Sequence, residues 1–156
     1  MTSLPESVVQ LWRDLSVEIR PAARSEKFLS FERQNGMAIP EELAAFYRVS
    51  DGVESDQNLF AVWELAAVRR APVAVGDFRG IPDYGQIATA LPNADEYLVF
   101  ADFMIMSHVF AVHVDPTSRL MGQVIWISGS DHGVAATSFR AFWEAYLADQ
   151  WDAVSI

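Results

Sequence analysis

The apolar residues of this chain change their spacing near residue 58, and that change restricts the fold class. Before it, side chains such as Val8, Leu11 and Trp12 recur every three or four residues, as on one face of a helix. After it, residues 59–64 alternate as in a strand, and residues 137–151 return to the helical spacing. We therefore expect an α+β fold, with a mostly antiparallel sheet and with N-terminal helices and a closing C-terminal helix packed against it.

One helix has clear start and stop signals. In the stretch NGMAIPEELAAFYRVSDGVE (residues 35–54), Pro40 suits a first helical turn because its missing N–H group would have no partner there. Glu41 and Glu42 follow, where the helix dipole favours negative charge. Gly52 is expected to supply the left-handed exit. The apolar face of this helix should carry Leu43, Phe46 and Tyr47.

The same signals predict the other elements. A helix within residues 25–36 should have Ser25 as its cap and should end at Gly36. Gly and Pro interrupt residues 69–96 too often for a long element, so an irregular excursion is expected there. The stretch SGSDHGV (residues 128–134) is expected to be a polar loop before the last helix. Strands rich in β-branched and aromatic residues are expected within 96–103, 106–115 and 122–129.

The net charge is −10, and it is unevenly distributed along the 156 residues. Acids and bases cancel in residues 1–33, whereas the rest of the chain has 16 acids against 6 bases. Residues 80–118 contain no Lys or Arg. Such a field repels nucleic acid and anionic membranes, and it attracts basic proteins. The alternative interpretation is that the charge serves only solubility.

Composition also indicates the cellular compartment and the number of domains. The chain has no cysteine, so disulfides and thiolate metal sites are excluded, which fits a reducing compartment. It has no run of 18 apolar residues, and its first residues lack the basic leader of a signal peptide. Because 51% of the residues are hydrophobic, we expect one domain, residues 1–156, with a core of its own. We expect this domain to be cytoplasmic, since the cytoplasm is a reducing compartment.

The three histidines are the first candidates for chemistry. His108 and His113 are five residues apart in one expected strand, so they should face opposite sides and should not bind one metal ion together. His113 and Asp115 should share a face, where a carboxylate can orient an imidazole. Together with His132 they form one hypothesis, a small-molecule or hydrolytic site near one end of the sheet. The simpler interpretation makes His113 an exposed or half-buried strand residue and His132 part of a loop.

Known catalytic and ligand-binding motifs give no positive indication of an enzyme. The glycines of GDFRGIPDYG (residues 76–85) lack the spacing of a phosphate-binding loop. No zinc-protease, nucleophile-elbow or EF-hand motif occurs in the sequence. We therefore expect no catalytic residues, no cofactor and no metal ion.

A helix that ends in glycine, a hydrophobic–proline pair, an acidic–aromatic helix and an Asp-Gly turn follow one another in the first third of the chain. The residues are Phe31–Glu32, Gly36, Ile39–Pro40, Leu43, Phe46–Tyr47 and Asp51–Gly52. This order resembles the SUKH superfamily, and the expected strands and closing helix extend the resemblance to residues 25–148. The segment 69–93 has no counterpart in the family signature, and Asp51 stands where asparagine is more usual.

The resemblance implies a class of function and no catalytic set. Bacterial SUKH proteins are mostly immunity proteins that bind and neutralise a cognate toxin, often a nuclease, and fungal members are cell-wall regulators. Nuclease toxins are commonly basic because they hold nucleic acid, so an acidic inhibitor can cover that surface. The resemblance therefore implies a non-enzymatic immunity protein with a basic toxin as its partner. A regulatory or scaffold module is the alternative.

The expected contact surface consists of acids in or beside loops, with an exposed tyrosine as an anchor. Within residues 35–54 we expect the apolar residues to be scaffold, and any contact to involve the acidic margin from Asp51 to Asp56. The predicted contact residues are Asp51, Glu54, Asp56, Asp83, Tyr84, Asp95, Glu96 and Asp102.

Overall fold

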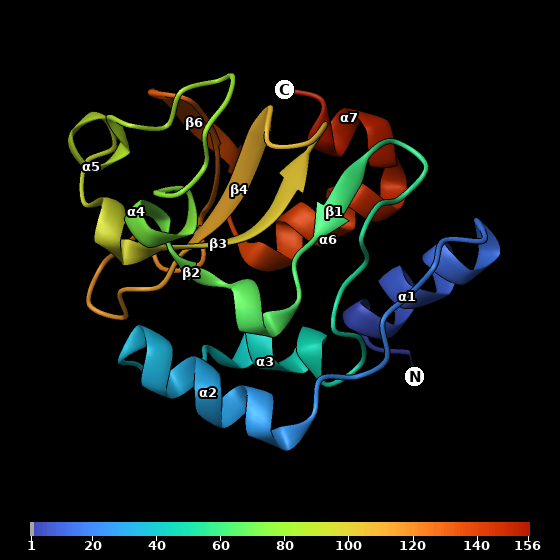
Figure 1. Cartoon of the computed structure of the whole chain (residues 1–156). Coiled ribbons are helices and arrows are strands. Elements are labelled where there is room, and N and C mark those ends of the chain that lie inside the picture. Colours follow the sequence, from blue (N-terminus) through green and yellow to red (C-terminus); the bar gives the residue numbers. More distant parts are fainter. Residues whose placement is uncertain (1) are drawn as a thin grey trace.

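A computed structural model of the protein describes residues 2–156, with helices at both ends of the chain and a sheet between them (Figure 1). This part of the chain has the expected α+β fold, and no helix in it is long and apolar enough to cross a membrane. The principal helices are α1 (Leu4–Asp14), α2 (Ser25–Asn35), α3 (Glu41–Tyr47), α6 (Phe139–Ala148) and α7 (Gln150–Val154).

Capping residues mark the start of α1 and the end of α2. At the start of α1 the Ser3 hydroxyl oxygen accepts a hydrogen bond from the Glu6 N–H group, and the Glu6 carboxylate accepts one from the Ser3 N–H group. Gly36 ends α2 in the left-handed conformation, as expected. Ser25 is not the cap of α2, because it is the first helical residue and Arg24 precedes it without a side-chain cap.

The third helix buries its aromatic face, as expected, but Pro40 is the cap residue before the helix and not a residue of its first turn. Gly52 has a different role from the predicted one, because α3 already ends at Tyr47. It lies in the next connection with a φ of 92°, and a Cβ atom there would be only 2.3 Å from the Val62 carbonyl oxygen. Gly52 thus permits a close backbone approach as well as a left-handed turn.

The sheet in the described residues is antiparallel and has six strands, in the order β1-β3-β4-β5-β6, with β2 also pairing with β3. The central strands β3, β4 and β5 lie within the segments predicted to form strands. The strands are β1 (Phe60–Val62), β2 (Arg69–Arg70), β3 (Tyr97–Phe103), β4 (His108–His113), β5 (Val124–Ser128) and β6 (Asp131–Ala136).

The edge strand β6 replaces the loop expected at residues 128–134. The chain turns at Gly129, which has a φ of 62°, and pairs back along β5. Gly133 lies under the Trp126 ring, where a Cβ atom would approach the indole to 2.7 Å. Because β6 is largely exposed at the edge of the sheet, it lacks the alternating apolar pattern that identifies a half-buried strand.

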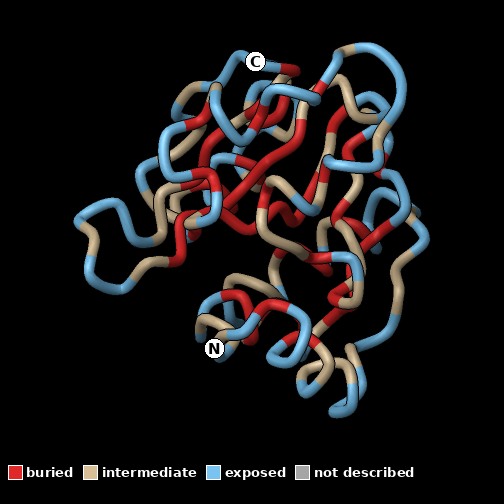
Figure 2. The backbone as a smooth tube through the Cα atoms, turned by 60° about the vertical axis from the view of Figure 1, so that its left-hand side comes forward, coloured by how far each residue is buried: buried red, intermediate tan, exposed pale blue. Residues whose placement is uncertain are grey.

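Both faces of the sheet are covered. Helix α6 packs against one face, α1 and α3 pack on α6, and together they form a core rich in aromatic rings. Short helices α4 (Ala71–Ala74) and α5 (Ile87–Ala90) cover the other face. The excursion predicted at residues 69–96 is therefore irregular, as expected, but its apolar side chains form a second core. Figure 2 shows buried residues concentrated in the strands and exposed residues in the connections.

Candidate functional site

Asp51, the first predicted contact acid, is buried and serves the fold. One of its carboxylate oxygens lies 2.6 Å from Nζ of Lys27, and the other accepts a hydrogen bond of 2.8 Å from the Leu65 N–H group. The hydrogen bond to Asp51 raises the pKa of Lys27. Asp51 thus joins α2 to the 3₁₀ turn η1 (Leu65–Ala67) and is not available to a partner, which corrects the prediction.

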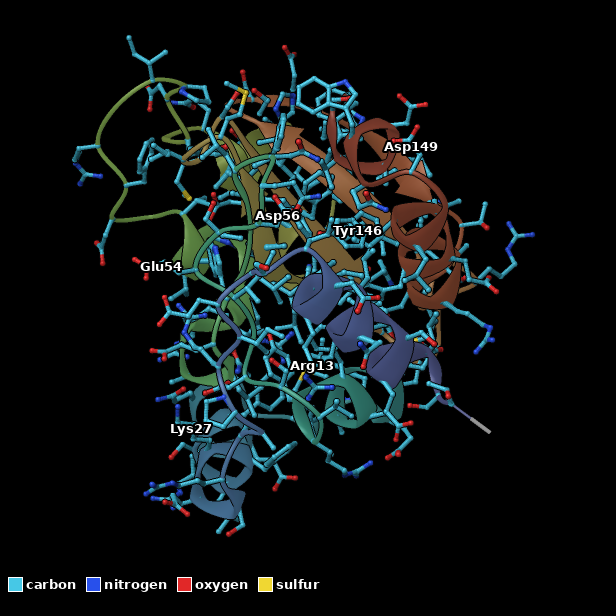
Figure 3. The ribbon with its side chains drawn as sticks, turned by 90° about the vertical axis from the view of Figure 1, so that its right-hand side faces the viewer. Arg13, Lys27, Glu54, Asp56, Tyr146 and Asp149 are labelled. Atoms are coloured by element: carbon cyan, nitrogen blue, oxygen red, sulfur yellow. The ribbon has the colours of Figure 1, made fainter. Side chains whose placement is uncertain are left out.

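Asp56 is also buried, with 6% of its surface exposed. Its Oδ1 atom accepts hydrogen bonds from the N–H groups of Asn58 and Phe60, at 2.7 and 3.0 Å. Its Oδ2 atom accepts one from the Tyr146 hydroxyl, which in turn accepts one from the Trp12 indole. Figure 3 shows Asp56 and Tyr146 together in the interior. This network joins the connection before β1 to α6 and α1, so Asp56 is structural and not a contact residue.

Tyr84 and Asp102 hold the β3–β4 hairpin. Tyr84 is only 1% exposed, so it is not the exposed anchor that we predicted. Its hydroxyl donates to the Met106 carbonyl oxygen at 2.7 Å, and burial raises its pKa. Asp102 is half-buried and accepts hydrogen bonds from the Trp63 indole, at 2.7 Å, and from the Met106 N–H group, at 3.3 Å.

The titration of Asp102 gives a testable pH dependence. Burial raises its pKa above the ordinary value, so its carboxylate opposes folding at neutral pH. That cost disappears as the pH falls through the raised pKa towards the ordinary one. On acidification from neutral pH to about pH 4, we expect the free energy of unfolding to fall less for the wild type than for Asp102→Asn. Urea titrations at each pH measure this difference, and parallel pH profiles would contradict it.

Asp95 and Glu96 lie at the other end of the sheet, in the 3₁₀ turn η2 (Ala94–Glu96) that precedes β3. Asp95 is exposed there. Glu96 is half-buried, and its Oε2 atom lies 2.8 Å from Nε2 of His113. His113 is fully buried against the Tyr97 ring, which corrects the expectation of an exposed or half-buried residue. Glu96 therefore has an internal partner, and neither acid adjoins the hairpin.

The hypothesis of a site built from His113, Asp115 and His132 finds no cluster. His132 pairs with Ile127 on exposed β6, and Ile127 pairs with Val109 at the hairpin end of β4. His113 lies at the opposite end of β4. Within residues 2–156, no three acidic or histidine side chains are placed to hold a metal ion. As expected, His108 and His113 face opposite sides of the sheet, since His108 packs on the Trp126 ring.

Several connections meet at the β3–β4 hairpin, at the top of Figure 1. The Met104 N–H group donates to the Leu59 carbonyl oxygen at 2.9 Å, which brings the connection before β1 to the tip. The Ser128 hydroxyl donates to the Ser107 carbonyl oxygen at 2.8 Å, which brings in the β5–β6 turn. Helix α7 joins them, because the Trp151 ring packs on Phe103 with centroids 5.7 Å apart.

Exposed acids and exposed apolar side chains both occur on these connections and on α7. Glu54, on the connection before β1, and Asp83 are the two predicted contact acids that are exposed on these connections. Figure 3 shows Glu54 and Asp149 at the surface, apart from each other on the left and the upper right of the view. Asp83 adjoins the β5–β6 turn, because a Cβ atom at Gly129 would lie 3.2 Å from the Asp83 carbonyl oxygen. We call this surface the acidic end. Its acids are Glu54, Asp83, Asp131, Asp149 and Asp152, and its exposed apolar residues are Leu59, Met104, Ile105 and Trp151.

The acidic end is made from sequence segments without positive charge. Residues 49–68, 80–118, 120–139 and 141–156 contain no Lys or Arg, and they supply all nine residues of the surface. The last of these segments is a sequence signal for the acidic end that the predicted contact residues do not include. Taken with the folded topology, it identifies Asp149 and Asp152 as neighbours of the hairpin.

Comparison of the chain with known protein families and with curated proteins gave no match.

Proposed function

We propose that the protein is a non-enzymatic, cytoplasmic immunity protein that binds and neutralises a cognate toxin through the acidic end. The observation that carries the proposal is a surface of exposed apolar side chains set among acids at one end of the sheet. Exposed apolar side chains rimmed by polar groups are typical of protein-binding sites. The apolar part supplies contact area, and the acids select the partner.

The charge of the acidic end indicates a basic partner. Five exposed acids lie on segments that contain no Lys or Arg, and the nearby cation Arg79, which lines a hollow with Asp83, offsets only part of this charge. Opposite charge on a partner increases the rate of encounter and disfavours wrong partners. The same field repels nucleic acid and anionic lipid, so a protein is the favoured ligand.

The resemblance to the SUKH superfamily supports a toxin as that protein. Its bacterial members mostly neutralise toxins, and a nuclease toxin has the basic surface that the acidic end would cover. The residues that carry the resemblance, such as Phe46 and Tyr47, are buried in the core. We therefore assign binding to the acidic end and the family pattern to the scaffold. A regulatory scaffold with a different basic partner is the alternative outcome of the test.

Growth rescue tests the proposed function. A toxin encoded beside this gene should arrest bacterial growth when expressed alone, and co-expression of the wild-type chain should restore growth. Neutralising Glu54, Asp83, Asp131 and Asp152 should weaken the rescue, because the electrostatic attraction is reduced. Failure of the wild-type chain to restore growth would contradict the proposal, and a non-toxic basic partner would favour the scaffold role.

A further inference from the structure

The tip of the β3–β4 hairpin has an unusual backbone. Met104, Ile105 and Met106 are consecutive and have φ angles of 51°, 52° and 68°, all in the left-handed region. Glycine, asparagine and aspartate adopt this region readily, whereas other L-residues adopt it at a cost in free energy. A β-branched residue such as Ile105 is a clear outlier there. Asn and Gly are the usual choices where a hairpin turn requires positive φ angles.

Burial in the core does not explain why large apolar residues stand at the tip of the hairpin. Ile105 is 80% exposed and Met104 is about half exposed. The chain therefore maintains large apolar side chains in water on a backbone that disfavours them. Unfavourable conformations of this kind concentrate at functional sites, where surrounding contacts hold them in place.

Hydrogen bonds from several parts of the chain hold the turn between β3 and β4. Asp102 accepts a hydrogen bond from the Met106 N–H group, and the Tyr84 hydroxyl donates to the Met106 carbonyl oxygen. The links to Leu59 and Ser128 described above hold the two ends of the turn. Three other parts of the chain, together with Asp102 on the hairpin itself, thus hold one short turn. The side chains of Met104 and Ile105 are presented on a fixed backbone, so little backbone entropy would be lost on binding.

We propose that Met104 and Ile105 form the anchor with which the protein enters an apolar pocket on its basic protein partner. This inference rests on the proposed function and names the residues that supply most of its affinity. The surrounding acids argue for a basic protein as the occupant, since a second copy of this chain or an anionic membrane would bring further negative charge to the tip.

A recess beside the anchor can receive a side chain of the partner. A hollow of about 570 Å³ opens between Trp63, Phe78 and Met106, with Arg20 and Glu64 also lining it. Met106 therefore separates the exposed anchor from an apolar recess. Side chains that dominate binding commonly pair with pockets across an interface.

The variant Ile105→Asn tests the anchor, because asparagine tolerates the left-handed region and removes the apolar side chain. We expect the melting temperature to rise by about 2–4 °C, as for a modest gain in stability in a chain of this size. We expect the dissociation constant for the inactivated toxin domain to increase about thirtyfold, as for a residue that dominates an interface. A purely structural residue would not combine a more stable fold with weaker binding.

The matched control is Leu29→Asn on α2, at the bottom of Figure 1. Leu29 is also a large exposed apolar residue, at 57% exposure, so its replacement should leave the dissociation constant within about twofold of the wild type. Calorimetric titration of the three proteins with the toxin domain measures the affinities, and thermal unfolding measures the stabilities.

The possible results separate the anchor from the proposed function. Equal affinities of wild type, Ile105→Asn and Leu29→Asn would overturn the anchor and leave the proposed function standing. A lower melting temperature for Ile105→Asn would also overturn it, because the backbone would then favour isoleucine. Binding of the wild type to phosphatidylcholine–phosphatidylglycerol vesicles, or a dimer that dissociates in Ile105→Asn, would replace it with a membrane contact or a self-contact. No binding of the wild type to the toxin domain would overturn the proposed function itself.

Discussion

Replacing Asp56 with alanine should lower the free energy of unfolding by about 3 kcal/mol, because it leaves several buried donors without an acceptor. The Phe60 N–H group and the Tyr146 hydroxyl both lose their hydrogen bond to this carboxylate. The Trp12 indole keeps its bond to a tyrosine that is no longer held in place. For a chain of this length, the melting temperature should fall by about 6–12 °C.

Glu54→Ala is the matched control for this prediction. Glu54 is exposed and lies two residues before Asp56, so its loss should change the free energy of unfolding by no more than about 0.5 kcal/mol. Urea unfolding, followed by tryptophan fluorescence, measures both variants. Equal stabilities of the two variants would show that Asp56 is not the centre of a buried network.

The comparison between Glu54 and Asp56 also shows where sequence patterns stop being informative. The order of helices and strands could be predicted because it depends on local sequence, as in α3 between Pro40 and Gly52 and in the β-branched and aromatic residues of β3 and β4. Whether an acidic side chain is buried or exposed depends on partners that are far away in the chain. Asp56 contacts Tyr146, which is 90 residues away, and no local pattern identifies that pair.

Tyr84 is a second example of the same limit. The stretch 76–85 is rich in glycine and proline, so a surface loop was the natural interpretation and an exposed tyrosine followed from it. In the folded chain this stretch covers the second face of the sheet, and Tyr84 is buried below the hairpin. The sequence shows that a regular element is excluded there, but it does not show which surface the segment covers.

The acidic end could be predicted only in part. Glu54 and Asp83 were among the predicted contacts because they lie in base-free segments. Asp131 was assigned to a loop, and Asp149 and Asp152 to the region of the last helix, with no reason to place them beside the hairpin. Their position results from the β5–β6 turn and from the packing of Trp151 on Phe103.

Neutralising the acidic end should act mainly on the rate at which the partner associates. In the variant Glu54→Gln, Asp83→Asn, Asp131→Asn and Asp152→Asn, we expect the association rate constant to fall about 10–100-fold at low salt. The dissociation rate constant should change much less, because the apolar anchor remains. Asp149 is left unchanged, since its side chain caps α7. The control neutralises exposed acids of the N-terminal region, with the same change in net charge: Asp14→Asn, Glu18→Gln, Glu26→Gln and Glu32→Gln.

Stopped-flow association with the inactivated toxin domain over a range of salt concentrations is the most direct test that the acidic end binds a basic partner. We predict that the wild type and the N-terminal control both associate fast at low salt and slow steeply as salt rises. The variant of the acidic end should start slow and depend only weakly on salt, because screening acts on charges that it lacks. Equal rates and equal salt dependence in the two four-site variants would contradict the assignment of this surface.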